Sequence, residues 1–186
     1  MINNFGTLGF EILGSDKWRS LSQKADDESF VLSLYVMENA IFDCSSNIDI
    51  IFISKDNEDG LKSAFENNTP VFVFESENVI CSFIESLKTI WNKDNTQIVD
   101  FDFEDLKELF QSKKSNVEII FECSDLNQEV YHNIMALFVN YSIKEYNALL
   151  ADLGNDSNCI VSIVSTANIH QKDKRFYASY SLADSK

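Results

Sequence analysis

Apolar and polar residues follow each other in blocks that predict alternating strands and helices. The runs NIDIIFIS, residues 47–54, and TPVFVFES, residues 69–76, are short and almost continuously apolar, as is typical of strands buried in a parallel sheet. The segment between them predicts a short helix that Asp56 or Asn57 caps and that ends near Asn67. Strand, helix and strand of these lengths predict a βαβ unit with a parallel pair and a right-handed crossover.

The pattern before this unit is less uniform. Residues 5–13 alternate loosely and predict a strand, and residues 15–29 predict a loop or a short helix. From Glu28 to Cys44, apolar residues recur at helical spacing and predict a buried helix, with one face made by Phe30, Leu34, Met37 and Ile41. A strand is the alternative there, because the run is rich in residues that favour strands.

After the unit, residues 78–91 predict an amphipathic helix that Asn78 caps. The stretch QIVDFDFEDLKELF, Gln97 to Phe110, then changes from an extended apolar run into a helical pattern, with a helix from Glu104 to Gln111. The rest of the chain predicts strands, one further helix ended by Gly154, and a hairpin between the last two strands; the strands are 117–123, 134–141, 159–166 and 175–183, and the helix is 143–153.

Two aspartates at the start of the helix at Glu104 form the candidate site. Asp102 and Asp105 stand three residues apart, a spacing that places both carboxylates on the opening turn. Acidic side chains there favour the positive end of the helix dipole, with Asp102 as the cap. On this local pattern a capping role is favoured over a catalytic one.

Composition limits the function. The chain has 186 residues, 45% of them apolar, which is enough for one ordinary domain or two very small ones. Thirty acidic against fifteen basic residues give a formal net charge of −15, so phosphates would be repelled and we expect no direct binding of DNA or RNA. The charge has two interpretations: solubility, which is favoured, or an acidic face that attracts a basic partner or mimics nucleic acid.

The residues that hold metals and nucleotides are sparse. Four widely spaced cysteines show no zinc or redox motif and predict buried free thiols in a reducing compartment. A phosphate cradle needs closely spaced glycines, whereas the turn from Lys55 to Gly60 is acidic where phosphate would lie. The N-terminal residues lack a signal-peptide pattern, and no apolar run is long enough to cross a membrane. We therefore expect a cytoplasmic protein without membrane contact, metal or cofactor.

The residues from about Asn78 to the end resemble the second half of the tubulin and FtsZ superfamily. In that family a long central helix leads into a loop with an NVDFADV-like motif, then a helix and a mixed-sheet domain. DFDFEDL, Asp100 to Leu106, is similar to that motif, with Asp102 and Asp105 at its acidic positions and Asp100 in place of the asparagine. The later run IMALFVNYSIKEYNALLADLGNDSNCIVSIVSTA resembles the family's core strand, helix and strand.

The match departs from the family in three places. The helix expected between Cys123 and Ile134 is almost absent, the front half is too short for a GTPase domain, and the phosphate signature GGGTGTG has no counterpart. The resemblance therefore implies a reduced Rossmann-like region with a connecting helix over residues 1–91. It also implies a small mixed-sheet α/β domain, like the C-terminal domain of FtsZ, over residues 92–186.

The resemblance also implies a role for the acidic loop. In FtsZ-like filaments this loop of one subunit reaches the nucleotide of the next and promotes GTP hydrolysis, so Asp100, Asp102 and Asp105 would contact a partner. Without a nucleotide site of its own, the chain is predicted to be a non-enzymatic pseudo-GTPase. It would act through protein contacts in cell division or the cytoskeleton, with a filament-forming GTPase or a second copy of itself.

Two other functions are compatible with the same residues. One is an acidic inhibitor or immunity-type protein that binds a basic partner, for which salt-sensitive association would be the sign. The other is a GTPase, or an activator in trans that uses Asp102 and Asp105 to position water on the nucleotide of its partner.

Overall fold

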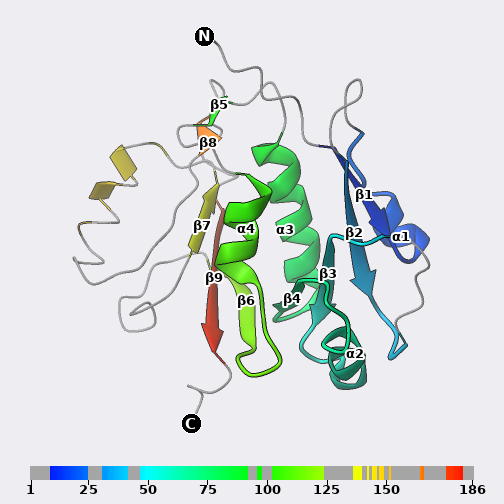
Figure 1. The fold of residues 1–186 in the computed structure, drawn as a ribbon. Coiled ribbons are helices and arrows are strands. Elements are labelled where there is room, and N and C mark those ends of the chain that lie inside the picture. The colour runs from blue at the N-terminus through cyan, green and yellow to red at the C-terminus, as the bar shows by residue number, and fades with distance from the viewer. Residues whose placement is uncertain are drawn as a thin grey trace.

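One seven-stranded sheet runs through the molecule (Figure 1). The computed structural model describes residues 9–24, 31–41, 47–91, 96–97, 102–123, 136–139, 142, 144–145, 147–148, 151, 164–165 and 175–181. In order across the sheet, the strands are β1 (Gly9–Leu13), β2 (Val31–Met37), β3 (Ile50–Ser54), β4 (Val71–Phe74), β6 (Glu118–Cys123), β9 (Arg175–Ser181) and β7 (Ala136–Val139).

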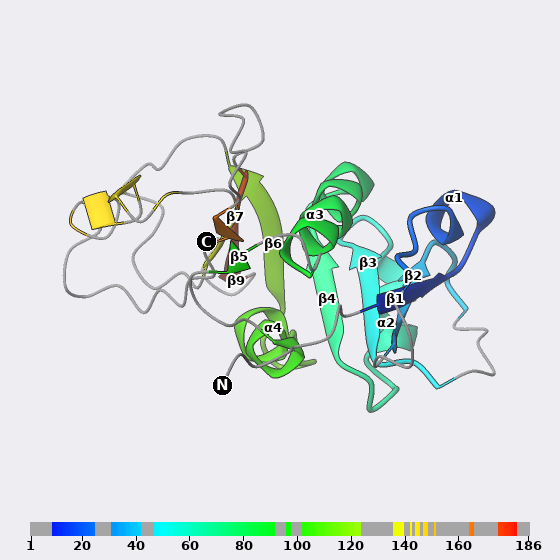
Figure 2. The same ribbon diagram turned by 90° about the horizontal axis from the view of Figure 1, so that it is seen from above.

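Strand direction makes this a mostly parallel mixed sheet. Each neighbouring pair from β1 to β6 is parallel, whereas β9 runs antiparallel to both β6 and β7. Figure 2 shows the succession from β1 at one end to β9 and β7 at the other. Two very short strands, β5 (Thr96–Gln97) and β8 (Val164–Ser165), pair separately. Within the described residues, four continuous helices are interleaved with the strands, so the predicted α/β class is confirmed; they are α1 (Asp16–Arg19), α2 (Glu58–Ala64), α3 (Glu77–Ile90) and α4 (Phe103–Phe110).

Alternating side chains divide the core between the two faces of the sheet. On what we call the α3 face, strand residues such as Phe52 and Phe72 pack with apolar residues of α1, α3 and α4. On the α2 face, residues such as Ile51 and Val73 pack with α2. Figure 1 shows α3 and α4 above the middle strands and α2 below them. Since β3 and β4 are buried on both faces, they read as continuous apolar runs.

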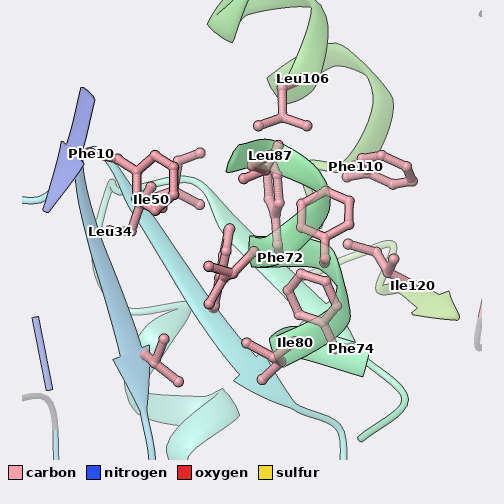
Figure 3. Close-up of a cluster of buried hydrophobic side chains, with 14 of the residues drawn as sticks. Phe10, Leu34, Ile50, Phe72, Phe74, Ile80, Leu87, Leu106, Phe110 and Ile120 are labelled. Carbon is pink, nitrogen blue, oxygen red and sulfur yellow. The ribbon is translucent and has the colours of Figure 1, made fainter. Parts of the chain in front are cut away.

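Aromatic rings fill the α3 face. Phe83 of α3 lies at the centre, with ring centroids of four neighbours 5.0 to 5.9 Å away, namely Phe52, Phe74, Phe110 and Tyr177. Most of these contacts are edge-to-face, an arrangement that favours aromatic pairs beyond simple burial. Figure 3 shows Phe72, Phe74 and Phe110 converging with aliphatic side chains from both helices.

The predicted βαβ unit is confirmed as β3, α2 and β4. The side chain of Asn57 caps α2, accepting a hydrogen bond of 3.0 Å from the N–H of Gly60. Ile51 points its side chain to the α2 face and donates its N–H toward β4, to the carbonyl of Pro70. For L-residues this combination makes the crossover through α2 right-handed, as predicted.

The connection from β4 to β6 has the opposite hand. It continues in the same direction across the sheet, but its helices α3 and α4 lie on the other face. This connection holds two helices rather than one, so the packing rule for short βαβ units applies to it less directly.

The segment from Glu28 to Cys44 was predicted to be a helix, and that prediction is wrong: residues 31–37 form β2. Leu34 points to the α3 face and Tyr35 to the α2 face, so both parities of the strand are buried. Ile41, expected on the buried helix face, is 74% exposed. A strand buried on both faces contains apolar residues at every spacing, which is why a helical period appeared.

Smaller differences concern boundaries and pairing. Ser76 rather than Asn78 is the N-cap of α3. The described residues of β8 pair with β5, so within the described part of the chain the predicted final hairpin is not found. Helical residues occur between positions 144 and 151, as predicted, whereas Gly154 lies outside the described residues. The sheet contains strands from both sides of position 91, joined by β4 and β6, and the division into two domains stays a prediction.

The outer edge of β1 is closed by the chain itself. Phe10 and Gln23 exchange two backbone hydrogen bonds of 2.9 Å, and Ser22 Oγ accepts another from the N–H of Ile12. A covered edge does not offer its backbone groups to a strand of another molecule. Association with a partner through this edge is therefore disfavoured.

Candidate functional site

The two predicted aspartates meet at the N-terminus of α4, where they form a reciprocal cap. Asp102 Oδ1 accepts hydrogen bonds from the N–H groups of Glu104 (2.9 Å) and Asp105 (3.0 Å). In return, Asp105 Oδ2 accepts one from the N–H of Asp102 at 3.0 Å. These bonds satisfy N–H groups that have no partner within the helix. The capping interpretation of Asp102 is therefore confirmed.

The cap leaves negative charge at the surface. Asp102 is exposed and Asp105 is half-buried. Glu104 pairs with Lys107, whose Nζ lies 2.6 Å from Oε2 and also lies over the ring of Phe103. A carboxylate accepts more bonds than this cap uses, so a partner could still bind there. Asp100, the third predicted residue, lies outside the described residues.

A larger group of carboxylates lies at the carboxyl end of the sheet, where open α/β folds hold their ligands. Acidic residues follow four neighbouring strands, β2, β3, β4 and β6, or lie at their ends. Since parallel strands end on the same side, these residues gather along one border of the molecule. We call this border the acidic edge; it comprises Glu38, Asp56, Glu58, Asp59, Glu75, Glu77 and Glu122.

Two lysines lie within the acidic edge and pair with its carboxylates. Nζ of Lys17 is 2.9 Å from Oε2 of Glu77, and this hydrogen bond, followed by the charges of Glu77, Cys81 and Glu38, raises the pKa of Lys17. Lys55 lies 3.7 Å from Glu75, and its pKa is raised first by Tyr180 and then by Glu75. Both lysines therefore stay charged, yet the seven carboxylates outnumber them.

The sequence contained a signal for this edge that motif reading missed. The acidic turn after β3 indicated that phosphate would be repelled there. Negatively charged residues also follow β2 and β4. In a parallel sheet the carboxyl ends of the strands lie at one edge, so charged residues that directly follow the strands lie close together there. The edge could therefore have been found by listing the residues that end each predicted strand.

A buried polar cluster joins α3 to β9 beneath the acidic edge. The hydroxyl of Tyr177 lies 2.6 Å from Ser82 Oγ and 2.8 Å from Ser86 Oγ. Arg175 donates from Nη1 to the carbonyl of Ser82 at 2.9 Å. Burial is the main cause of the raised pKa of Tyr177. The hydrogen bonds from Ser82 and Ser86 oppose this rise in part. The cluster ties α3 to β9 across the aromatic core.

Other chemistry is limited in the described part of the chain. No group of three or more His, Cys, Asp or Glu is placed there to hold a metal ion. Cys81 is a free thiol, as predicted, but it is half-buried rather than buried. Among the described helices, none has the length and apolar character needed to span a membrane.

Comparisons with known proteins do not assign the chain to a family. Neither a scan against protein-family models nor a search of curated proteins found a match. The resemblance to the tubulin and FtsZ superfamily therefore stays a prediction.

Proposed function

We propose that this chain is a non-enzymatic protein-binding module whose acidic edge contacts a basic face of another protein. The observation that carries the proposal is the gathering of seven carboxylates at the ends of four adjacent strands. The charged side chains of the described residues all lie exposed or half-buried, where another macromolecule can reach them.

The concentration of negative charge at the acidic edge favours a role in binding as well as in solubility. Carboxylates spread evenly over a surface would serve solubility equally well, whereas a concentrated group creates a local field. Such a field accelerates association with a basic partner and selects against acidic ones. Because exposed charges are screened by salt, the contact should weaken as the ionic strength rises.

The resemblance to FtsZ suggests one class of partner. A filament-forming GTPase would use the acidic N-terminus of α4, with Asp102, Asp105 and the neighbouring Asp100, as a second contact. An inhibitor of a basic protein would need the acidic edge alone. Variants of the two surfaces therefore separate these possibilities.

The turn after β3 supports a role without nucleotide. The N–H of Gly60 already bonds the side chain of Asn57. Glu58 and Asp59 occupy the first turn of α2, so a phosphate approaching it would meet two negative charges. Calorimetric titration of the purified chain with GTP or GDP and magnesium should therefore release no heat of binding. Micromolar affinity would overturn the proposal and favour the GTPase alternative.

Affinity capture from extracts of the source cells tests the acidic edge itself. The edge variant E38Q/D56N/E58Q/D59N is compared with a control variant, E11Q/E66Q/E85Q/E108Q, which removes the same charge elsewhere. We expect a basic protein that binds the native chain and the control, is lost from the edge variant, and elutes with added salt. Equal capture by both variants would contradict the assignment of the acidic edge.

A further inference from the structure

A groove lies between α4 and strands β6 and β9, at the end of β6 opposite Glu122 of the acidic edge. Its volume is about 430 Å³, and its wall continues along the turn between α4 and β6. Small-molecule sites commonly have volumes of roughly 300 to 1,000 Å³. The groove is therefore large enough for a ligand of a few residues.

The hydroxyl of a largely buried serine lines this groove. Ser179 of β9 is 6% exposed and is one of three buried polar side chains in the described part of the chain. The other two are hydrogen-bonded: Ser86 to Tyr177 and to a helix carbonyl, and Ser112 to the backbone of Glu118. The Ser179 hydroxyl has no hydrogen bond of this kind among the described residues, where the one fully enclosed side-chain atom without a partner is Nε1 of Trp18. The Ser179 hydroxyl instead lines the groove, where a ligand can bond to it.

Charged side chains of both signs line the groove without an ion-pair partner among the described residues. Lys113 and Glu108 line it, and neither has an ion-pair partner among the described residues. The backbone of Lys113 is held in place, since Lys113 and Asn116 exchange hydrogen bonds of 3.0 and 2.9 Å across the turn. The amide of Gln111 adds both a donor and an acceptor.

The remaining polar walls are occupied internally. Lys107 is engaged by Glu104, and Asn116 bonds both Glu118 and Ser181. These contacts fix the walls in position, so little ordering is needed when a ligand enters. Glu118 keeps its negative charge, because its partner Asn116 is neutral. The groove thus offers one ammonium, two carboxylates, one amide and one hydroxyl.

We propose that this groove binds a small zwitterion of the dipeptide class. The ligand's carboxylate would meet Lys113 and the hydroxyl of Ser179, and its ammonium would meet Glu108. A simple anion is disfavoured because the net charge of −15 repels it, and a simple cation would leave Lys113 unpaired. A zwitterion carries no net charge and pairs with both groups.

The test is an NMR titration of the ¹⁵N-labelled chain with alanylalanine. We expect amide shifts at residues 107–118 and at Ser179, with an affinity in the range of about 0.1 to 10 mM. N-acetyl-alanylalanine lacks the ammonium and alanylalanine amide lacks the carboxylate, so each should bind about fivefold or more weakly. Free alanine, which has both charges but is shorter, should shift the same amides at higher concentration.

Matched variants assign the contacts. Ser179→Ala should weaken the binding of alanylalanine about fivefold, whereas Ser115→Ala, an exposed serine of the neighbouring turn, should leave it unchanged. Lys113→Gln should weaken binding by a similar factor, without shifting amides remote from the groove. The proposal is overturned by an absence of shifts with the native chain at about 20 mM dipeptide. Equal affinity for the blocked dipeptides, or equal effects of the two serine variants, would overturn it as well.

Discussion

The aromatic core of the α3 face and the acidic edge differ in how they are held together. In the core, Phe83 touches four other rings and the buried Tyr177 hydroxyl has two partners. Along the edge, the side chains reach into solvent and make few, exposed ion pairs. Exposed pairs contribute little to stability, whereas buried contacts contribute several kcal/mol. Substitutions should therefore separate stability from binding.

The largest loss of stability is expected from Phe83→Ala, at the centre of the rings. Removing a fully buried ring leaves a cavity, so we expect the free energy of unfolding to fall by about 3 to 5 kcal/mol. Urea denaturation measures it. Phe65→Ala, a half-buried phenylalanine at the end of α2, is the matched control and should cost clearly less. Equal losses would show that the α3 face is not the main core.

Tyr177→Phe tests the polar part of the core. It leaves the buried Ser86 hydroxyl with one partner fewer, so we expect a loss of about 1 to 2 kcal/mol below pH 10.

The pH dependence of that loss follows from the raised pKa of Tyr177, whose ordinary value is 10.0. Above this pH the unfolded chain loses the phenol proton while the folded chain keeps it, so unfolding is favoured as pH rises. The stability difference between native chain and variant should therefore shrink above about pH 10. Denaturation midpoints at pH 8 and about pH 10.5 measure the change, and a difference that grows with pH would contradict it.

Asp102→Ala removes the cap of α4, a helix that contributes Leu106 and Phe110 to the core. Loss of an N-cap side chain should lower the free energy of unfolding by about 1 kcal/mol. Asp102→Asn retains the capping oxygen without the charge and should recover most of that loss. If the asparagine variant is as unstable as the alanine variant, the charge rather than the hydrogen bonds stabilises this helix.

The smallest effect on stability is expected from the edge variant E38Q/D56N/E58Q/D59N. Relief of repulsion along the edge opposes the loss of favourable charge at the start of α2. The free energy of unfolding should therefore change by less than about 1 kcal/mol, while binding of a basic partner is lost. Thermal denaturation at low and high salt measures the change in stability. A loss comparable to that of Phe83→Ala would show that the edge is structural.

Local patterns predicted the elements whose stabilising contacts lie close in sequence. The cap of α2 depends on Asn57 and Gly60, and the cap of α4 on Asp102 and Asp105, each three residues apart. The runs that became β3 and β4 were recognisable because a parallel strand buried on both faces is apolar throughout.

The same rule explains the error at β2. Its apolar run has no polar face, so periodicity alone could not separate a strand from a buried helix. The strand conformation is stabilised by pairing with β1 and β3, and those pairings depend on the rest of the sheet.

For this protein, the sequence alone determined the α/β class, the βαβ unit, the caps of α2 and α4, and the large negative charge. Tertiary structure decided the strand order, the gathering of carboxylates from four strands, and the contact of Tyr177 with Ser82, 95 positions away. It also placed Ser179 beneath α4. The physical reason is range: caps and periodicity act over a few residues, whereas sheet order is set by burial of all strands together.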